Sequence, residues 1–243
     1  MADMLGPIGF PSFILVSVVL GIRLLRLALR TRKLPELAIS LNFLLAAGLG
    51  YSLLIAAESL RLLPESLAGV ASFVGVSALS VGGVLLALFT CQVFRPASRA
   101  AAGGLLACAF WLLLGVYGSG ALHVSRESSG LGAWLGHWAP NLGLLVVYAW
   151  SSFEPLRYHV LLRRRARIGF GDPLVANRLM LWGLSAGGLV AIALIHLSAQ
   201  LAGYYDLPPS LVGASSILVL AIAACEWLAF FPPAAYLRRF VEA

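Results

Sequence analysis

Apolar residues run along this chain in long blocks, and charged residues gather in the short segments between the blocks. A helix that crosses a bilayer needs about 20 consecutive, mostly apolar residues. Seven blocks meet this requirement and predict seven transmembrane helices, at about 10–30, 37–60, 67–94, 98–122, 132–157, 174–202 and 210–237. Because the blocks occupy most of the 243 residues, the sequence predicts one all-α, polytopic membrane domain over residues 1–243.

The composition also indicates a membrane protein and argues against catalysis of the kind found in soluble enzymes. Hydrophobic residues make up 60% of the chain and charged residues 11%, and the mean hydropathy is +0.93. A soluble domain has about 25% charged residues. The sequence holds no recognisable nucleophile–base arrangement and no metal-ligand spacing such as HExxH. We therefore expect an integral membrane protein that is not an enzyme and has no metal site.

The basic residues predict the orientation of the chain. If the N-terminus lies outside, 15 of the 17 Lys and Arg residues fall in inner segments, and only Arg61 and Arg126 fall outside. Cytoplasmic segments carry such an excess, so the sequence predicts an N-out, C-in topology in a plasma (inner) membrane of the bacterial type. The formal net charge of +7 then reflects contact with anionic lipid head groups at the inner face, and not binding to nucleic acid.

Part of the sequence recurs within the chain. Asn42-x-Leu44-x-x-x-Gly48 recurs 135 positions later as Asn177-x-Leu179-x-x-x-Gly183, and Leu63-Pro64 recurs 144 positions later as Leu207-Pro208. Matching leucines are common in so apolar a chain, but matching Asn, Pro and Gly residues are not. The distance between matching positions increases from 135 to 144 residues, which places an insertion in the second copy, around residues 203–206.

An internal repeat of this kind marks a duplicated structural unit. It predicts a 3+1+3 arrangement, with repeat 1 at about 10–94, a connector helix at about 98–122 and repeat 2 at about 132–240. Because four spans separate each helix from its copy, both halves are expected to cross the membrane in the same direction. Such parallel repeats are related by a pseudo-two-fold axis along the membrane normal, and the binding site is expected between them.

The plan of seven spans, an outer N-terminus and a parallel 3+1+3 repeat resembles that of the sugar-transporting SWEET proteins and, more loosely, that of microbial rhodopsins. The resemblance is architectural and covers the whole chain. A Pro-Gln dipeptide of the PQ-loop kind is absent. A rhodopsin would need a lysine in its seventh span to bind retinal, and the only lysine of this chain is Lys33. A covalent retinal cofactor is therefore excluded, and no other cofactor is expected.

Glu226 is the first candidate for a functional residue, because a charge deep in a span costs at least about 2.5–3.5 kcal/mol. Its equivalent in the first repeat is Gly82, so the carboxyl group is not a remnant of the duplication. Burial disfavours the charged form, and we expect a neutral carboxyl group that faces the bundle interior. The alternative is a glutamate that only links helices by a hydrogen bond.

Asn42 and Asn177 are the next candidates, because the repeat would place them opposite each other near the inner boundary. Two amide groups can gate a pathway or bind a polar group of a ligand. They can equally well connect helices by hydrogen bonds worth about 0.6–2 kcal/mol each.

Three further residues are secondary candidates. Glu58 and His196 lie at the outer ends of their spans, where a position at the water interface is the main alternative to a functional role. Arg178 is expected either to reach the interface with its long side chain or to pair with Glu154.

Two short motifs are given a structural interpretation. The segment Gly183-Leu-Ser185-Ala-Gly187 fits G-x-S-x-G, but it lies in a predicted span and lacks the strand–turn–helix context of a nucleophile elbow. It is interpreted as a row of small residues that lets two helices approach closely. Pro233-x-x-Tyr236 fits the P-x-x-Y of seven-helix receptors, but the pattern leaves two positions free and is weak evidence.

Three functions remain open from the sequence. The repeat favours a small-molecule transporter or permease with a site between the halves and Glu226 as a coupling group. The second is a seven-helix sensor or receptor-like protein that binds an apolar ligand and signals to a cytoplasmic partner. The third is an accessory subunit of a larger membrane complex. A homo-oligomer also remains open, because rows of small residues fit contact with a second copy as well as packing within the bundle.

Overall fold

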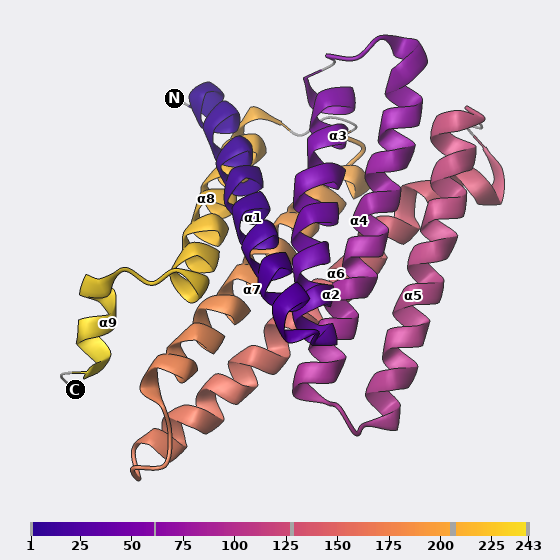
Figure 1. The fold of residues 1–243 in the computed structure, drawn as a ribbon. Helices are drawn as coiled ribbons and strands as arrows, with labels where there is room; N and C mark the ends of the chain where they lie inside the picture. The colour runs from indigo at the N-terminus through magenta and orange to yellow at the C-terminus, as the bar shows by residue number, and fades with distance from the viewer. Residues whose placement is uncertain (1, 61, 127–128, 205–207, 242–243) are drawn as a thin grey trace. The chain divides into compact units, whose positions relative to one another are not determined.

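The computed structural model describes residues 2–60, 62–126, 129–204 and 208–241, and all regular secondary structure in these ranges is helical (Figure 1). This confirms the predicted all-α class. The α-helices are α1 (Ala2–Thr31), α2 (Leu34–Asn42), α3 (Ser52–Leu54), α4 (Glu65–Phe94), α5 (Arg99–Ser119), α6 (Gly130–Ala166), α7 (Pro173–Leu201), α8 (Pro209–Phe230) and α9 (Ala234–Val241). The π-helices are η1 (Phe43–Tyr51), η2 (Ile55–Ser59) and η3 (Gly120–Val124).

In the described part of the chain, six helices are long and apolar enough to cross a membrane, which indicates an integral membrane protein. They are Gly9–Thr31, Leu34–Glu58, Glu65–Phe94, Arg99–Val124, Pro173–Leu201 and Ser210–Phe230. Six of the seven predicted spans correspond to these helices. The predicted span 132–157 lies within α6, a single helix of 37 residues that is less apolar because His137, Asn141 and Glu154 interrupt its apolar residues. A seventh crossing stays a prediction.

The second predicted span is one continuous run of helical turns from Leu34 to Ser59, in which α2 and α3 alternate with η1 and η2. Pro35 stands in the first turn of α2, where its missing N–H group costs no hydrogen bond. The run changes to the wider π-helical turns directly after Asn42. π-helical turns within α-helices are rare and occur frequently at functional sites.

The start of α7 is capped by Asp172. One carboxylate oxygen of Asp172 accepts hydrogen bonds from the backbone N–H groups of Leu174, at 2.8 Å, and Val175, at 3.3 Å. Pro173 occupies the first turn, where its fixed φ suits a helix. Asp172 therefore satisfies two of the N–H groups that every helix leaves unpaired at its start.

The C-terminal end of α6 closes with a Schellman motif at Gly169. The backbone N–H of Phe170 donates to the carbonyl of Arg165 at 2.9 Å, and that of Gly169 donates to the carbonyl of Ala166 at 3.1 Å. Gly169 has a φ of 79°, a left-handed conformation in which a Cβ atom is strained. The same pair of hydrogen bonds ends α7 at Gly203, so both helices stop at a glycine.

The last predicted span, 210–237, is not one helix. α8 ends at Phe230, and α9 begins at Ala234 after a bend that contains Pro232 and Pro233. Each proline lacks a backbone N–H group and cannot continue the hydrogen bonding of the preceding turn. The helix is therefore broken completely between Phe230 and Ala234.

The helices pack into two compact units, each of which is described by itself. One unit is Ser17–Val147, and the other combines Met1–Val16 with Tyr148–Ala243. The division falls within α1 and within α6. The predicted repeat boundaries follow whole spans and therefore do not coincide with these units.

In the unit Ser17–Val147, α4 packs against η1 through glycines. A Cβ atom added to Gly50 of η1 would lie 3.1 Å from the carbonyl oxygen of Gly75. A Cβ atom added to Gly82 of α4 would lie 2.8 Å from the Cβ atom and 3.1 Å from the backbone nitrogen of Ala46. Such close contact between backbones is how helices gain packing energy in lipid, where apolar burial does not distinguish between partners.

In the second unit, α7 and α8 lie side by side along their length (Figure 1). Gly188 of α7 faces Ile222 of α8, with 2.6 Å between a Cβ atom added to the glycine and the isoleucine side chain. The first part of α1 packs on α8 near the start of that helix, where Gly9 approaches the backbone of Ser216.

Candidate functional site

The residues around Glu226 form the interior face of α8. Val219, Ile222, Ala223 and Ala229 recur at the spacing of one helical face, and all four are buried. Glu226 lies on the same face and is 3% exposed. A carboxyl group therefore occupies a position that the helix otherwise fills with apolar side chains, as the sequence predicted.

Glu226 is hydrogen bonded to the neighbouring helix. The hydroxyl of Ser185, on α7, donates to Oε1 of Glu226 at 2.9 Å, and both side chains are buried. Hydrogen bonds across helices in a membrane protein contribute about 0.6–2 kcal/mol. The bond fixes the rotation of α7 and α8 about their axes, because both residues must face the contact.

The position of Ser185 depends on the glycines beside it. Gly183 approaches α6 so closely that an added Cβ atom would lie 2.6 Å from the Leu156 side chain. The hydroxyl of Ser152, on α6, donates to the carbonyl oxygen of Gly183 at 2.8 Å. One short segment of α7 is thus bonded to α6 through Gly183 and to α8 through Ser185.

An aromatic contact lies beside this polar pair, on the same two helices. The rings of Trp182, on α7, and Phe230, on α8, meet edge to face with 5.6 Å between their centroids. Edge-to-face pairs of this kind are worth about 0.5–1.5 kcal/mol beyond the area that they bury. The Ser185–Glu226 hydrogen bond therefore lies in a contact that is held by apolar packing as well.

The two asparagine candidates occupy different units. Asn177, on α7, is half-buried, and its amide nitrogen donates to the hydroxyl oxygen of Tyr236, on α9, at 2.6 Å. Asn42 is buried at the end of α2, where the π-helical turns begin. The structure gives Asn177 a partner within its own unit, and the predicted pairing of the two asparagines stays a prediction.

The secondary candidates lie nearer to solvent. Glu58 and Arg178 are exposed, and His196 is half-buried. Glu154 is buried and forms an ion pair of 4.0 Å with Arg157, which is three residues further along α6. Arg178 forms no ion pair within the described residues, so of the two predicted environments its exposed position fits the interface.

Sequence reasoning found Glu226 but missed its partner. Ser185 lies between Gly183 and Gly187, in a row of small residues that predicts close packing of helices. The signal available was a hydroxyl in the centre of that row, in a span that neighbours the one with the buried carboxyl group. The P-x-x-Y pattern predicts no partner for Tyr236, and the contact of Tyr236 with Asn177 depends on the break before α9.

Comparisons with protein-family models, with curated proteins and with solved structures each find no match for this chain.

Proposed function

We propose that this integral membrane protein is a small-molecule transporter or permease in which the Ser185–Glu226 pair is the coupling site. The observation that supports the proposal is a carboxyl group, 3% exposed, that is hydrogen bonded to a hydroxyl on the next helix. Ionisable groups within membrane spans are costly and occur mainly on substrate, ion and proton pathways.

The chemistry of the pair suits a group that gains and loses a proton. A carboxylate only accepts hydrogen bonds, whereas a protonated carboxyl group donates one. A serine hydroxyl can donate and accept, so Ser185 can remain bonded to Glu226 in either state. A transported proton, or a cation in its place, is the partner that the pair would accept.

The repeat supports a specialised role for the second half of the chain. By the sequence match, Ser185 corresponds to Gly50, and Glu226 corresponds to Gly82. Both partners of the hydrogen bond therefore stand where the first half has glycine. A bond that was needed only for packing would be expected in both halves, whereas here the pair is present in one.

We propose that α6 is a seventh crossing, because an N-out, C-in chain needs an odd number of crossings. Cysteines introduced at Ser129, before α6, and at Ile168, after it, should be labelled from opposite sides in a background without Cys91, Cys108 and Cys225. Both substituted residues are exposed. Labelling of Ser129→Cys from outside supports the predicted orientation, and labelling of both positions from one side contradicts the seventh crossing.

The function is tested by reconstituting the protein in liposomes and offering a mixture of small metabolites under an inward proton gradient, with mass spectrometry of the vesicle contents. Glu226→Gln keeps the shape and an acceptor for Ser185 but cannot release a proton. We expect this variant to lose accumulation against a concentration gradient while it retains exchange of the substrate across the membrane. The matched control is Glu58→Gln, which alters an exposed carboxyl group and should leave both activities intact.

The three functions that the sequence leaves open predict different results for the same protein preparation. Accumulation by Glu226→Gln at the wild-type level would contradict the coupling role. If the wild-type protein accumulates nothing but is stabilised by an apolar compound, the sensor interpretation is favoured. If neither occurs and the protein is isolated from membranes with another subunit, the accessory role is favoured.

A further inference from the structure

Two contacts fix the register of α7 against α8. The hydroxyl of Ser185 bonds to Glu226, and Gly188 faces Ile222, with 2.6 Å between a Cβ atom added to the glycine and the isoleucine side chain. From the first contact to the second, the residue numbers rise along α7 and fall along α8, so the two helices are antiparallel. Residues at the same level can therefore be found by counting equal steps from the Ser185–Glu226 pair.

The next polar pair along this contact is formed by His196 on α7 and Ser215 on α8. His196 lies eleven residues after Ser185. Ser215 lies eleven residues before Glu226, in the same direction along the contact. Eleven residues make three turns and about 20°, so both side chains keep almost the direction of the bonded pair. His196 and Ser215 are thus level with each other on the faces that meet, about 16 Å along the helices from Glu226.

The hydroxyl of Ser215 is buried without a partner. Ser215 is 0% exposed, and within the described residues its Oγ atom has no hydrogen bond. By contrast, the hydroxyl of Ser216 donates to the carbonyl of Val212 in its own helix, at 2.8 Å. A buried hydroxyl that lacks a partner costs about 1–3 kcal/mol. If packing were the only role of position 215, an apolar residue of similar size would be more favourable.

His196 lies where water can reach it. Its side chain is half-buried, and α7 ends five residues later at Leu201, which is the outer end of the helix by the predicted orientation. A neutral imidazole ring donates from one nitrogen and accepts at the other, and the accepting nitrogen can gain a proton. Within the described residues no hydrogen bond joins His196 to Ser215. A water molecule both donates and accepts, so it is the group that would connect the two side chains.

Apolar side chains separate this level from Glu226. Val219 and Ile222 are buried on the same face of α8, between Ser215 and Glu226. Ile222 covers Gly188, which has no side chain of its own. A change in the rotamer of Ile222 would therefore uncover space between the helices without a movement of either backbone.

We propose that His196 and Ser215 take up the proton that Glu226 binds, and that Ile222 closes the path between the two levels. This inference rests on the proposed function and names the side from which the coupling group is protonated. His196 gains a proton from outer water and passes it to the water bonded to Ser215. While Ile222 is turned away, water carries the proton onward. The carboxylate of Glu226 then becomes a carboxyl group, and His196 is neutral again.

The test follows the exchange of the Glu226 carboxyl hydrogen for deuterium, with the full chain in nanodiscs and time-resolved infrared spectroscopy. Transfer into D₂O lowers the frequency of the C=O stretch of a protonated carboxyl group, and Glu226→Gln identifies the band. His196→Gln keeps a polar side chain that cannot carry a proton, and Ser215→Ala removes the hydroxyl. Each should slow the exchange by at least about tenfold, because a positioned proton-transfer group contributes about 10²–10⁴-fold.

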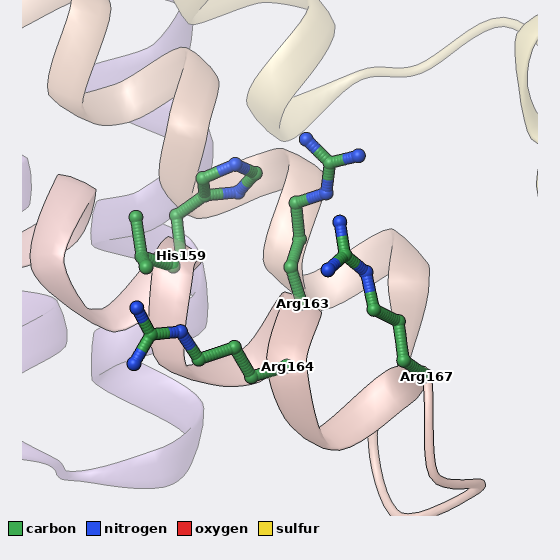
Figure 2. Close-up of a pocket in the computed structure, with 5 residues that line it drawn as sticks. His159, Arg163, Arg164 and Arg167 are labelled. Carbon is green, nitrogen blue, oxygen red and sulfur yellow. The ribbon is translucent and has the colours of Figure 1, made fainter.

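Each variant has a matched control. Ser216→Ala removes a neighbouring buried hydroxyl that is already bonded within its own helix. His159→Gln makes the same change on α6, in the stretch that carries Arg163 and Arg167 (Figure 2). His159 is also half-buried, but its Nδ1 atom lies 2.7 Å from the carbonyl oxygen of Ala176, near the opposite end of α7. Both controls should exchange at the wild-type rate, because neither group lies on the proposed path.

A variant of the closing residue acts in the other direction. Ile222→Ala should speed the exchange severalfold, because the shorter side chain no longer covers Gly188. Exchange at the wild-type rate in both His196→Gln and Ser215→Ala would overturn the inference, and so would equal slowing by Ser216→Ala.

The infrared readout needs no substrate, so its failure differs from a failure of the proposed function. If Glu226→Gln loses accumulation in liposomes but His196→Gln exchanges at the wild-type rate, the coupling role stands and this path is rejected. If no protonated Glu226 band is found at any pH at which the protein is folded, both proposals are contradicted.

Discussion

Between η1 and α4 the closest contacts are made at glycines, whereas between α7 and α8 a hydroxyl group meets a carboxyl group. In the first contact, Gly82 faces the backbone of Ala46 with no space for a Cβ atom. In the second, Ser185 donates a hydrogen bond to Glu226, and both are buried. The contact between η1 and α4 is stabilised by the close packing of two backbones. The contact between α7 and α8 is stabilised in part by a hydrogen bond between two polar side chains.

The difference lies in sequence positions that the internal match makes equivalent. By the predicted repeat, Glu226 would correspond to Gly82, and Ala46, the residue that faces Gly82, would correspond to Leu181. Glu226 does not bond at that level but to Ser185, one helical turn further along α7. A buried carboxyl group thus requires a partner within its own reach, and Ser185 supplies one where the first half has Gly50.

The largest effect that we expect from this comparison is that of Gly82→Ala. An added Cβ atom would lie 2.8 Å from the Cβ atom and 3.1 Å from the backbone nitrogen of Ala46, and the backbone cannot give way. Overpacking of this kind costs about 1–3 kcal/mol of the free energy of unfolding. The measurement is reversible unfolding of the purified protein in mixed micelles, followed by tryptophan fluorescence.

Two matched substitutions sharpen this result. Gly188→Ala meets only the side chain of Ile222, which can change its rotamer, so we expect a smaller loss than for Gly82→Ala. Gly103→Ala has no atom within 4 Å of the added Cβ atom and should be neutral or slightly stabilising. Equal losses for Gly82→Ala and Gly188→Ala would contradict the distinction between the backbone contact of α4 with η1 and the side-chain contact of α7 with α8.

The next effect is the loss of the Ser185–Glu226 hydrogen bond in Ser185→Ala. We expect the free energy of unfolding to fall by about 0.6–2 kcal/mol, because the carboxyl group loses a donor while it stays buried. A double-mutant cycle with Glu226→Leu isolates the interaction, since the two substitutions should not be additive if the residues are bonded.

The control for this cycle is Ser216→Ala combined with Glu226→Leu. Ser216 is also buried, but its hydroxyl donates to the carbonyl of Val212 in its own helix, at 2.8 Å. Its substitution should be additive with Glu226→Leu. If the cycle with Ser185 shows no coupling either, the hydrogen bond does not contribute to the contact between α7 and α8.

The sequence predicts those features that depend on local composition. Blocks of apolar residues define the six membrane helices, Asp172 and Pro173 mark the start of α7, and Pro232 and Pro233 mark the end of α8. The π-helical turns of η1 are not predictable in this way, because the apolar residues that form them would equally form an α-helix. The crossing by α6 stays a prediction, because His137, Asn141 and Glu154 make this helix less apolar than the other six.

Only one of the two residues of the candidate site is predictable from the sequence. A carboxyl group in an apolar span is visible in the sequence, and Glu226 was identified on that basis. Its partner depends on how α7 and α8 are rotated and on their relative register, which local patterns do not determine. The same reason applies to Asn177, whose partner Tyr236 is brought into reach by the break before α9.

The smallest effect concerns the helix ends at which the two units differ. α1 is terminated by Arg32, which has a φ of 55° and donates its backbone N–H to the carbonyl of Ala28 at 2.7 Å, whereas α6 is terminated by Gly169 with a φ of 79°. A residue with a Cβ atom loses about 1–2 kcal/mol in this conformation, and glycine does not. Arg32→Gly should therefore stabilise the protein, by about 0.5–1 kcal/mol once the greater freedom of glycine in the unfolded chain is subtracted. Arg32→Ala removes the same charge but keeps the strain, so it should not stabilise. An equal gain for both substitutions in the micelle unfolding assay would assign the effect to the charge, and the end of α1 would then be no more strained than the glycine-capped end of α6.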